Sequence, residues 1–135
     1  MGGALTSGPG AVADPVSGTG TVGVRGTDGR LYEFRLNAQG IGGLTNVGTP
    51  LCSAPAYAVR SAAAGSTTLA FRAGDLSVSV AGMSIGGMVT SAPALVADPA
   101  GSGITAFGRG TDNALWAYTG TPGGGSWSSL GGVLN

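Results

Sequence analysis

The sequence contains no histidine and no lysine, and it has a single cysteine in 135 residues. Without histidine, it lacks the commonest general base and the commonest metal ligand in proteins. The lone Cys52 can complete neither an intrachain disulfide nor a thiolate metal cluster. These absences exclude zinc centres and histidine-dependent catalytic triads, so we predict no metal and no cofactor.

Charged residues are also scarce, at 9% of the chain. Six basic and six acidic residues give a formal net charge of zero, so no basic surface is available to neutralise a phosphate backbone. No run of about 18 apolar residues is present, and the N-terminal segment lacks the basic-then-apolar order of a signal peptide. Neither nucleic acid nor a membrane is therefore predicted as a partner.

The sequence is instead rich in glycine, with 28 residues, and contains seven prolines. Such a composition alone would suggest low complexity, but 42% of the residues are hydrophobic, which is ample material for a core. The length suits one domain with a single core. We therefore expect a folded, turn-rich protein.

Three short motifs recur in the same order along the chain, which indicates an internal repeat. The first contains Ser and Pro at fixed spacing and occupies residues 5–9, 51–55 and 89–93. The second contains Arg followed by a Gly/Asp turn and occupies 24–32, 71–77 and 108–116. The third closes each unit and occupies 47–51, 85–89 and 130–134. The chain thus divides into three repeats, at about 5–50, 51–88 and 89–134.

Apolar residues alternate over short runs inside each repeat, as in residues 21–25 and 31–35, and this period of two predicts β-strands. The Gly-Thr-Asp-Gly and Gly-Thr-Asp-Asn segments at 26–29 and 110–113 lie between such runs and predict hairpin turns. Four strands fit in each repeat, which is the size of a propeller blade. We predict an all-β chain of three four-stranded antiparallel propeller blades.

The motifs Thr-Ser-Ala-Pro (90–93), Arg-Gly-Thr-Asp-Asn-Ala-Leu-Trp (109–116) and Trp-Ser-Ser-Leu-Gly-Gly-Val-Leu (127–134) resemble repeats of bacterial β-propeller lectins of the fucose-binding, tectonin-like kind. The resemblance is closest in the third repeat. It is weakest in the second, where we take Ser77 and Ser79 to replace Trp116 and Tyr118. Propellers of that family carry more than three repeats. The resemblance implies a neutral glycan as ligand, held between blades, and favours an extracellular location.

Candidate ligand-binding residues follow from the same resemblance. Trp127 comes after the glycine-rich segment 123–126, which we interpret as a loop, and its ring would offer a sugar an apolar platform and a free N–H. Burial between blades is the alternative for Trp116, and a lid over the blade edge is the alternative for Trp127. The predicted ligand-binding residues are Trp127, Trp116, Tyr118, Ser128 and Arg109 in the third repeat, and Tyr32 and Arg25 in the first.

Acid–base catalysis has little support in the distribution of carboxylates. Five of the six recur at corresponding places in the repeats, whereas an active site is normally assembled once. Only Glu33 stands alone, without a second unique acid as partner. We therefore predict that the protein is not an enzyme. The recurring carboxylates, which we assign to turns, are Asp14, Asp28, Asp75, Asp98 and Asp112.

Three blades are too few for a closed ring, since propellers have roughly 4 to 8. We expect a homo-oligomer, with a six-bladed homodimer favoured and a trimer as the other possibility. In that arrangement the best sugar sites would lie where the third repeat of one copy meets the first repeat of the next. Clefts involving the second repeat should bind weakly. The alternative function is a structural or protein-interaction propeller segment that binds no sugar.

Overall fold

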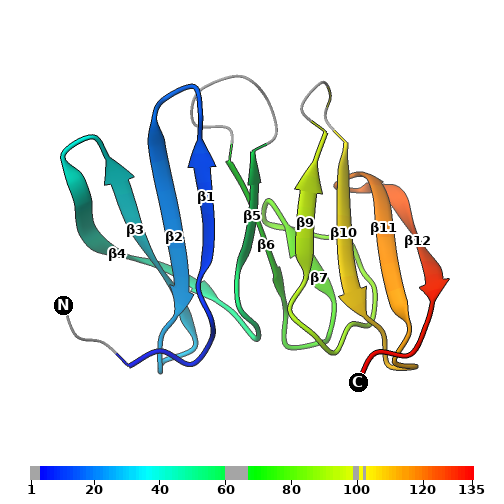
Figure 1. Cartoon of the computed structure of the whole chain (residues 1–135). Helices are drawn as coiled ribbons and strands as arrows, with labels where there is room; N and C mark the ends of the chain where they lie inside the picture. The colour runs from blue at the N-terminus through cyan, green and yellow to red at the C-terminus, as the bar shows by residue number, and fades with distance from the viewer. Residues whose placement is uncertain (1–3, 60–66, 99–100, 102) are drawn as a thin grey trace.

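The computed structural model describes residues 4–59, 67–98, 101 and 103–135. Within these residues the chain forms twelve β-strands and no helix, arranged as three four-stranded antiparallel sheets (Figure 1). The all-β prediction and the division into three four-stranded units are therefore confirmed.

Each sheet is built from four strands that are consecutive in sequence. Sheet 1 consists of β1 (Gly10–Asp14), β2 (Thr19–Arg25), β3 (Arg30–Asn37) and β4 (Gly40–Pro50). Sheet 2 consists of β5 (Ala56–Val59), β6 (Thr67–Arg72), β7 (Val78–Val80) and β8 (Met83–Ser84). Sheet 3 consists of β9 (Ala94–Ala97), β10 (Ile104–Arg109), β11 (Leu115–Thr121) and β12 (Gly124–Gly131).

The turn between the second and third strands has the same construction in all three sheets. Its last residue is in the left-handed region, with φ of 76° at Gly29, 70° at Leu76 and 62° at Asn113. An aspartate one position earlier accepts a hydrogen bond from the backbone N–H two residues further on, and in each sheet that distance is 3.0 Å. The predicted turn role of Asp28, Asp75 and Asp112 is thereby confirmed.

This turn also corrects the alignment of the second repeat. Asp75 accepts the N–H of Ser77 just as Asp112 accepts that of Ala114, so Ser77 corresponds to Ala114. Ser79, paired with Phe71, corresponds to Trp116, which is paired with Gly108. Our assignment of Ser77 to the place of Trp116 was wrong by two residues.

The segment that leads from one sheet to the next is also repeated. The N–H groups of Leu51, Val89 and Leu134 each donate to the carbonyl oxygen of the left-handed turn residue of the sheet just completed. Glycines with positive φ at 48, 86 and 131 allow the chain to turn toward this position. Leu51 and Val89 are both 1% exposed, so each crossing buries an apolar side chain between two sheets.

The sheets stand side by side, with the first strands β1, β5 and β9 as neighbours (Figure 1). Because side chains alternate along a strand, each sheet has two faces. In sheets 1 and 2, the face toward the following sheet carries Leu31 and Val78, and we name it the forward face. The corresponding face of sheet 3 carries Leu115. The opposite face, which carries Tyr32, Ser79 and Trp116, is the rear face.

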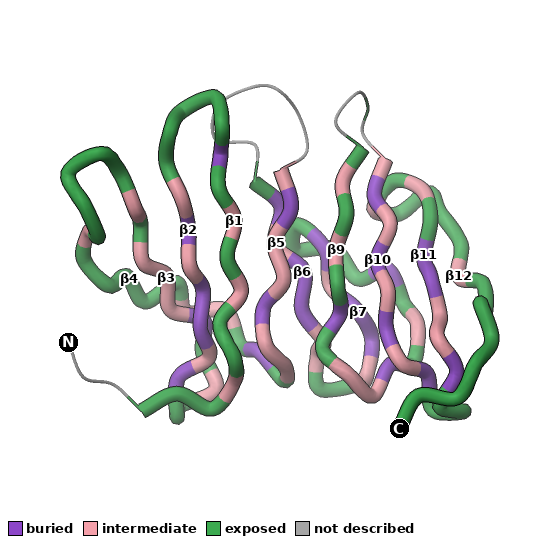
Figure 2. Tube along the Cα trace, viewed as in Figure 1, coloured by how far each residue is buried: buried purple, intermediate pink, exposed green. Residues whose placement is uncertain are grey.

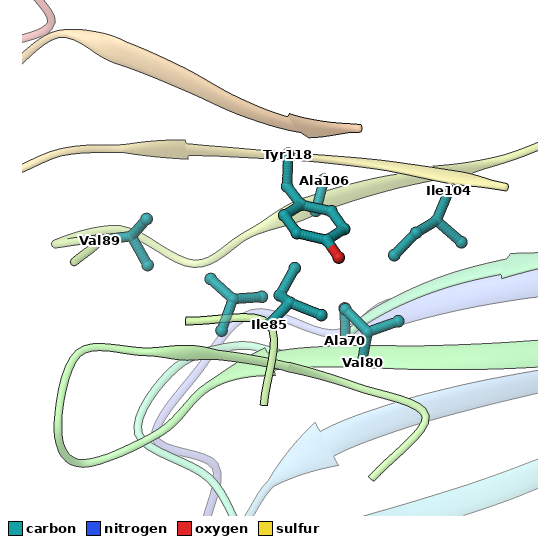
Figure 3. Close-up of a cluster of buried hydrophobic side chains, with 8 residues drawn as sticks. Ala70, Val80, Ile85, Val89, Ile104, Ala106 and Tyr118 are labelled. Atoms are coloured by element: carbon teal, nitrogen blue, oxygen red, sulfur yellow. The ribbon is translucent and has the colours of Figure 1, made fainter. Parts of the chain in front are cut away.

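The core lies where a forward face meets the next rear face. Between sheets 1 and 2 the buried side chains are Leu31, Leu51 and Phe71. Between sheets 2 and 3, Figure 3 shows Tyr118, Ile104 and Ala106 facing the side chains of sheet 2. The cluster at this second junction consists of Ala70, Val78, Val80, Ile85, Val89, Ile104, Ala106 and Tyr118.

Burial is concentrated in the inner strands of each sheet, whereas the outermost strands β4 and β12 are largely exposed (Figure 2). Two sheet faces have no neighbour in the part of the chain that the structure describes: the rear face of sheet 1 and the forward face of sheet 3. Both are apolar. Leu44 on the first of these faces is 52% exposed, and Val96 on the second is 57% exposed.

A tyrosine and a glutamate form a polar contact between sheets 1 and 2. The Tyr57 hydroxyl donates to Glu33 Oε1 at 2.8 Å. Burial raises the pKa of Tyr57 above a tyrosine's ordinary value of about 10, and the bond to Glu33 raises it further. The folded state therefore holds this proton more tightly than the unfolded state does.

We predict that this contact makes the protein sensitive to alkali. Stability contributed by the protonated Tyr57 is complete below about pH 10 and is lost as the pH rises above that value, because only the unfolded state then ionises readily. Thermal melts between about pH 8 and pH 11 should show a falling midpoint for the parent and a smaller fall for Tyr57→Phe. Parallel curves for the two proteins would contradict the assignment.

Candidate functional site

A cleft of about 180 Å³ opens between sheets 2 and 3. Sheet 3 contributes the two tryptophans of the chain and the turn between β10 and β11, and sheet 2 contributes the segment that leads out of β8. The lining residues are Gly87, Met88, Val89, Gly110, Thr111, Asp112, Trp116 and Trp127. The cleft is smaller than the pockets of about 300–1,000 Å³ that hold drug-sized ligands.

Trp116 forms one wall of this cleft. It lies on the rear face of β11, and its indole Nε1 donates to Asp112 Oδ1 at 3.1 Å and Oδ2 at 3.2 Å. Gly110 lies beneath the ring, because a Cβ there would be 2.6 Å from Trp116 Cδ1. The glycine and the turn aspartate therefore set the orientation of the indole.

Trp127 forms the other wall. Its Nε1 donates to the carbonyl oxygen of Ile85 at 2.8 Å, and its ring meets Tyr118 edge-on, with centroids 5.6 Å apart and planes at 62°. A Cβ on Gly87 would be 2.8 Å from the indole. Trp127 is thus fixed between the two sheets, with part of its surface exposed to the cleft.

Two expectations about Trp127 are corrected by this geometry. Gly124, Gly125 and Ser126 are part of β12, where they pair with β11, so only the start of segment 123–126 is a turn. The indole N–H was predicted to be free but is bonded to Ile85. The glycines serve packing, because a Cβ on Gly125 would be 2.6 Å from the Tyr118 ring.

Tyr118 lies in the core and not in the cleft. It is 3% exposed, and its hydroxyl donates to the carbonyl oxygen of Thr121 at 2.7 Å. Ser128 pairs with Ala117 on the forward face of sheet 3, opposite to the face that carries Trp127. Of the candidates in the third repeat, the structure therefore places only Trp116 and Trp127 in the lining of the cleft.

The two candidate arginines hold the chain where it enters a sheet. Arg25 donates through Nε to the carbonyl oxygen of Leu51 at 2.6 Å and through Nη1 to Thr6 Oγ1 at 2.7 Å. Arg109 donates through Nε to Thr90 Oγ1 at 2.9 Å. Both side chains lie on forward faces, away from the tryptophan cleft.

Tyr32 occupies in sheet 1 the position that Trp116 occupies in sheet 3. Its hydroxyl donates to Asp28 Oδ2 at 2.9 Å, and Asn46 Nδ2 donates to the same hydroxyl at 3.4 Å. The bond to Asp28 raises the pKa of Tyr32, while the N–H of Arg30 lowers the pKa of Asp28. By its register opposite Val24, Tyr32 stands on the uncovered rear face of sheet 1.

The position of the tryptophans corrects our expectation for the best site. We expected Trp116, Tyr118 and Trp127 to face a blade supplied by a second copy, but all three face sheet 2 of the same chain. The strand register places them on the rear face, because Ala106 pairs with Tyr118 and Tyr118 with Trp127. The second repeat, which we expected to be excluded from the best cleft, contributes segment 87–89 to its lining.

From the sequence we did not identify the other lining residues, which are Gly110, Thr111, Asp112 and segment 87–89. Asp112 was recognised only as a turn residue, yet its carboxylate also holds Trp116. The closing motif of the second repeat was a signal for segment 87–89, because its glycines allow the chain to pass close beneath an aromatic ring.

Comparisons of the chain with protein-family models and with curated proteins return no match. No group of three or more histidine, cysteine, aspartate or glutamate side chains that could hold a metal occurs among the described residues. The same residues contain no helix that is long and apolar enough to span a bilayer.

Proposed function

We propose that the protein is a carbohydrate-binding module of the β-propeller type that holds a neutral sugar between Trp116 and Trp127. The observation that carries the proposal is the cleft itself, in which two indole rings from different strands and one carboxylate converge on a small apolar space. Aromatic rings bind the C–H face of a sugar, and a carboxylate accepts hydrogen bonds from its hydroxyl groups.

The hydrogen bonds already present in the cleft define what a ligand would use. Both indole N–H groups are engaged, so the tryptophans would contribute their ring faces. The Asp112 carboxylate accepts from Ala114 and Trp116, and two carboxylate oxygens provide about four lone-pair sites. Sites that remain on Asp112, together with the Thr111 hydroxyl, would select a hydroxyl-bearing ligand.

An array of immobilised neutral glycans tests this proposal, with the parent and Trp116→Ala compared at equal concentration. We expect the parent to be retained on a subset of sugars and the variant to lose that retention, because one of the two stacking surfaces is removed. Thr119→Ala, on the opposite face of the same strand, is the control and should bind like the parent. Equal retention of parent and Trp116→Ala would reject the site.

A structural or protein-interaction module is the second candidate, favoured by the engagement of both indole N–H groups within the chain. In that case Trp116 and Trp127 serve only to seal the edge between sheets 2 and 3. Failure of the parent to bind any glycan, with its melting curve intact, would favour this candidate.

The three sheets act, in this proposal, as propeller blades, and a second copy of the chain completes a ring of six. The uncovered rear face of sheet 1 supports this arrangement, because it repeats the apolar row of a covered rear face. The row Ala11, Val22, Phe34 and Leu44 on sheet 1 corresponds by register to the row Leu95, Ala106, Tyr118 and Trp127 on sheet 3. The latter row packs on sheet 2.

A ring of two copies would also repeat the cleft, in a different form. Asp28 and Tyr32 would take the places of Asp112 and Trp116, and residues 132–134 of the other copy those of 87–89. The corresponding cleft between sheets 1 and 2 would have Ser79 instead of a ring. Light scattering tests the assembly: a dimer has twice the chain mass of 12.9 kDa, and a trimer would give nine blades.

A further inference from the structure

At each observed junction between sheets, one side chain from the first strand of the following sheet packs together with a cross-strand pair of the preceding sheet. At the junction of sheets 1 and 2 this side chain is Tyr57, and the pair is Gly10 and Gly23. A Cβ on Gly10 would be 3.3 Å from Tyr57 Cδ2, and a Cβ on Gly23 would be 2.8 Å from Tyr57 Cε2. Two glycines thus make room for one large ring.

The junction of sheets 2 and 3 uses the same positions with different sizes. The cross-strand pair is Ala56 and Ala70, and the side chain packed with them in the core is Leu95. Both receiving residues are larger than glycine, and the incoming side chain is smaller than tyrosine. Where the receiving pair is larger, the incoming side chain is therefore smaller, as close packing requires.

The uncovered faces continue this series. On the forward face of sheet 3 the corresponding cross-strand pair is Ala94 and Phe107. On the rear face of sheet 1 the position of Tyr57 and Leu95 is taken by Ala11, which is exposed and pairs with Val22. The large side chain now stands on the receiving pair, and the incoming residue is small.

We infer that Phe107 of one copy packs over Ala11 of a second copy, in a head-to-tail contact between the forward face of sheet 3 and the rear face of sheet 1. The inference rests on the proposed ring of two copies and identifies the residues that join them. The three junctions would then contain Gly, Gly and Tyr; Ala, Ala and Leu; and Ala, Phe and Ala. The rear face of sheet 1 corresponds to rear faces that pack on a forward face elsewhere in the chain. The forward face of sheet 3 in a second copy is therefore its natural complement.

Three variants test this contact: Ala11→Leu, Phe107→Ala and the double variant. Ala11→Leu inserts bulk against Phe107, whereas Phe107→Ala leaves a cavity, so each should weaken the dimer about tenfold or more. The double variant places a leucine over two alanines, which reproduces the composition found at Ala56, Ala70 and Leu95. We expect its dissociation constant to return to within about threefold of the parent value.

Analytical ultracentrifugation over a range of concentrations measures these constants, and circular dichroism melts check that each variant folds. A monomeric parent would overturn both the ring and this contact. A dimeric parent with unaffected single variants, or with single effects that simply add in the double variant, would overturn the contact and leave the ring in place. Weakened dimers in both single variants and a restored dissociation constant in the double variant would support the contact. A merely structural defect in one sheet would not be repaired by a change in the other.

Discussion

Replacing Trp127 by alanine is expected to lower the free energy of unfolding by about 3 kcal/mol, the lower part of the range for truncating a large aromatic side chain in a core. The ring packs edge-on against Tyr118, and its N–H donates to the carbonyl oxygen of Ile85, which directly follows β8. The variant loses both contacts. It should also lose sugar binding, because one wall of the cleft is removed.

Chemical denaturation monitored by circular dichroism measures this change. Val16→Ala, which truncates a side chain that is 53% exposed, is the control and should stay within about 0.5 kcal/mol of the parent. Trp127→Phe should fall between the two, since it keeps a ring beside Tyr118 but leaves the Ile85 carbonyl unpaired. A Trp127→Ala variant as stable as Val16→Ala would mean that Trp127 is only a surface lid.

The second large effect is expected at Gly23, where alanine should cost about 2 kcal/mol. A methyl group there would collide with the hydroxyl and ring of Tyr57, and Tyr57 is held in place by Glu33. The two sheets would have to move apart or Tyr57 would have to leave its partner. Either response disturbs the junction of sheets 1 and 2.

Gly43→Ala is the matched control, since Gly43 also lies in a strand of sheet 1 but has open space around its Cβ position and no positive φ. Denaturation of both variants under the same conditions measures the difference between them. Equal stability of Gly23→Ala and Gly43→Ala would show that Tyr57 is not packed over Gly23.

The strand count and the turns were predictable because their signals are local. The Gly/Asp segments contain residues that tolerate a positive φ and an aspartate that accepts a backbone N–H two residues on, so they predict a hairpin wherever they occur. The same rule, applied to Asp75, would have aligned Ser79 with Trp116. We missed this because Leu76 replaces the Gly29 and Asn113 of the other repeats, and a leucine with φ of 70° is rare.

The faces of the sheets were not predictable from alternation alone. A period of two places Trp116 and Tyr118 on one face of β11 but does not say which neighbouring sheet that face meets. The answer depends on long-range packing, in this case on Val80 of sheet 2 and on Ile85, which directly follows β8. For the same reason the sequence pattern could not show that Trp127 Nε1 finds a partner in Ile85, 42 residues earlier in the chain.

Tryptophan fluorescence during titration with neutral monosaccharides is the most direct test of the central claim, that a sugar binds between Trp116 and Trp127. The chain has only these two tryptophans, and both line the cleft, so the signal reports on the proposed site alone. We predict a saturable change in emission with a sugar that the glycan array identifies, and its loss in Trp116→Phe combined with Asp112→Ala. Binding of that sugar, measured by calorimetry, without any change in emission would contradict the account.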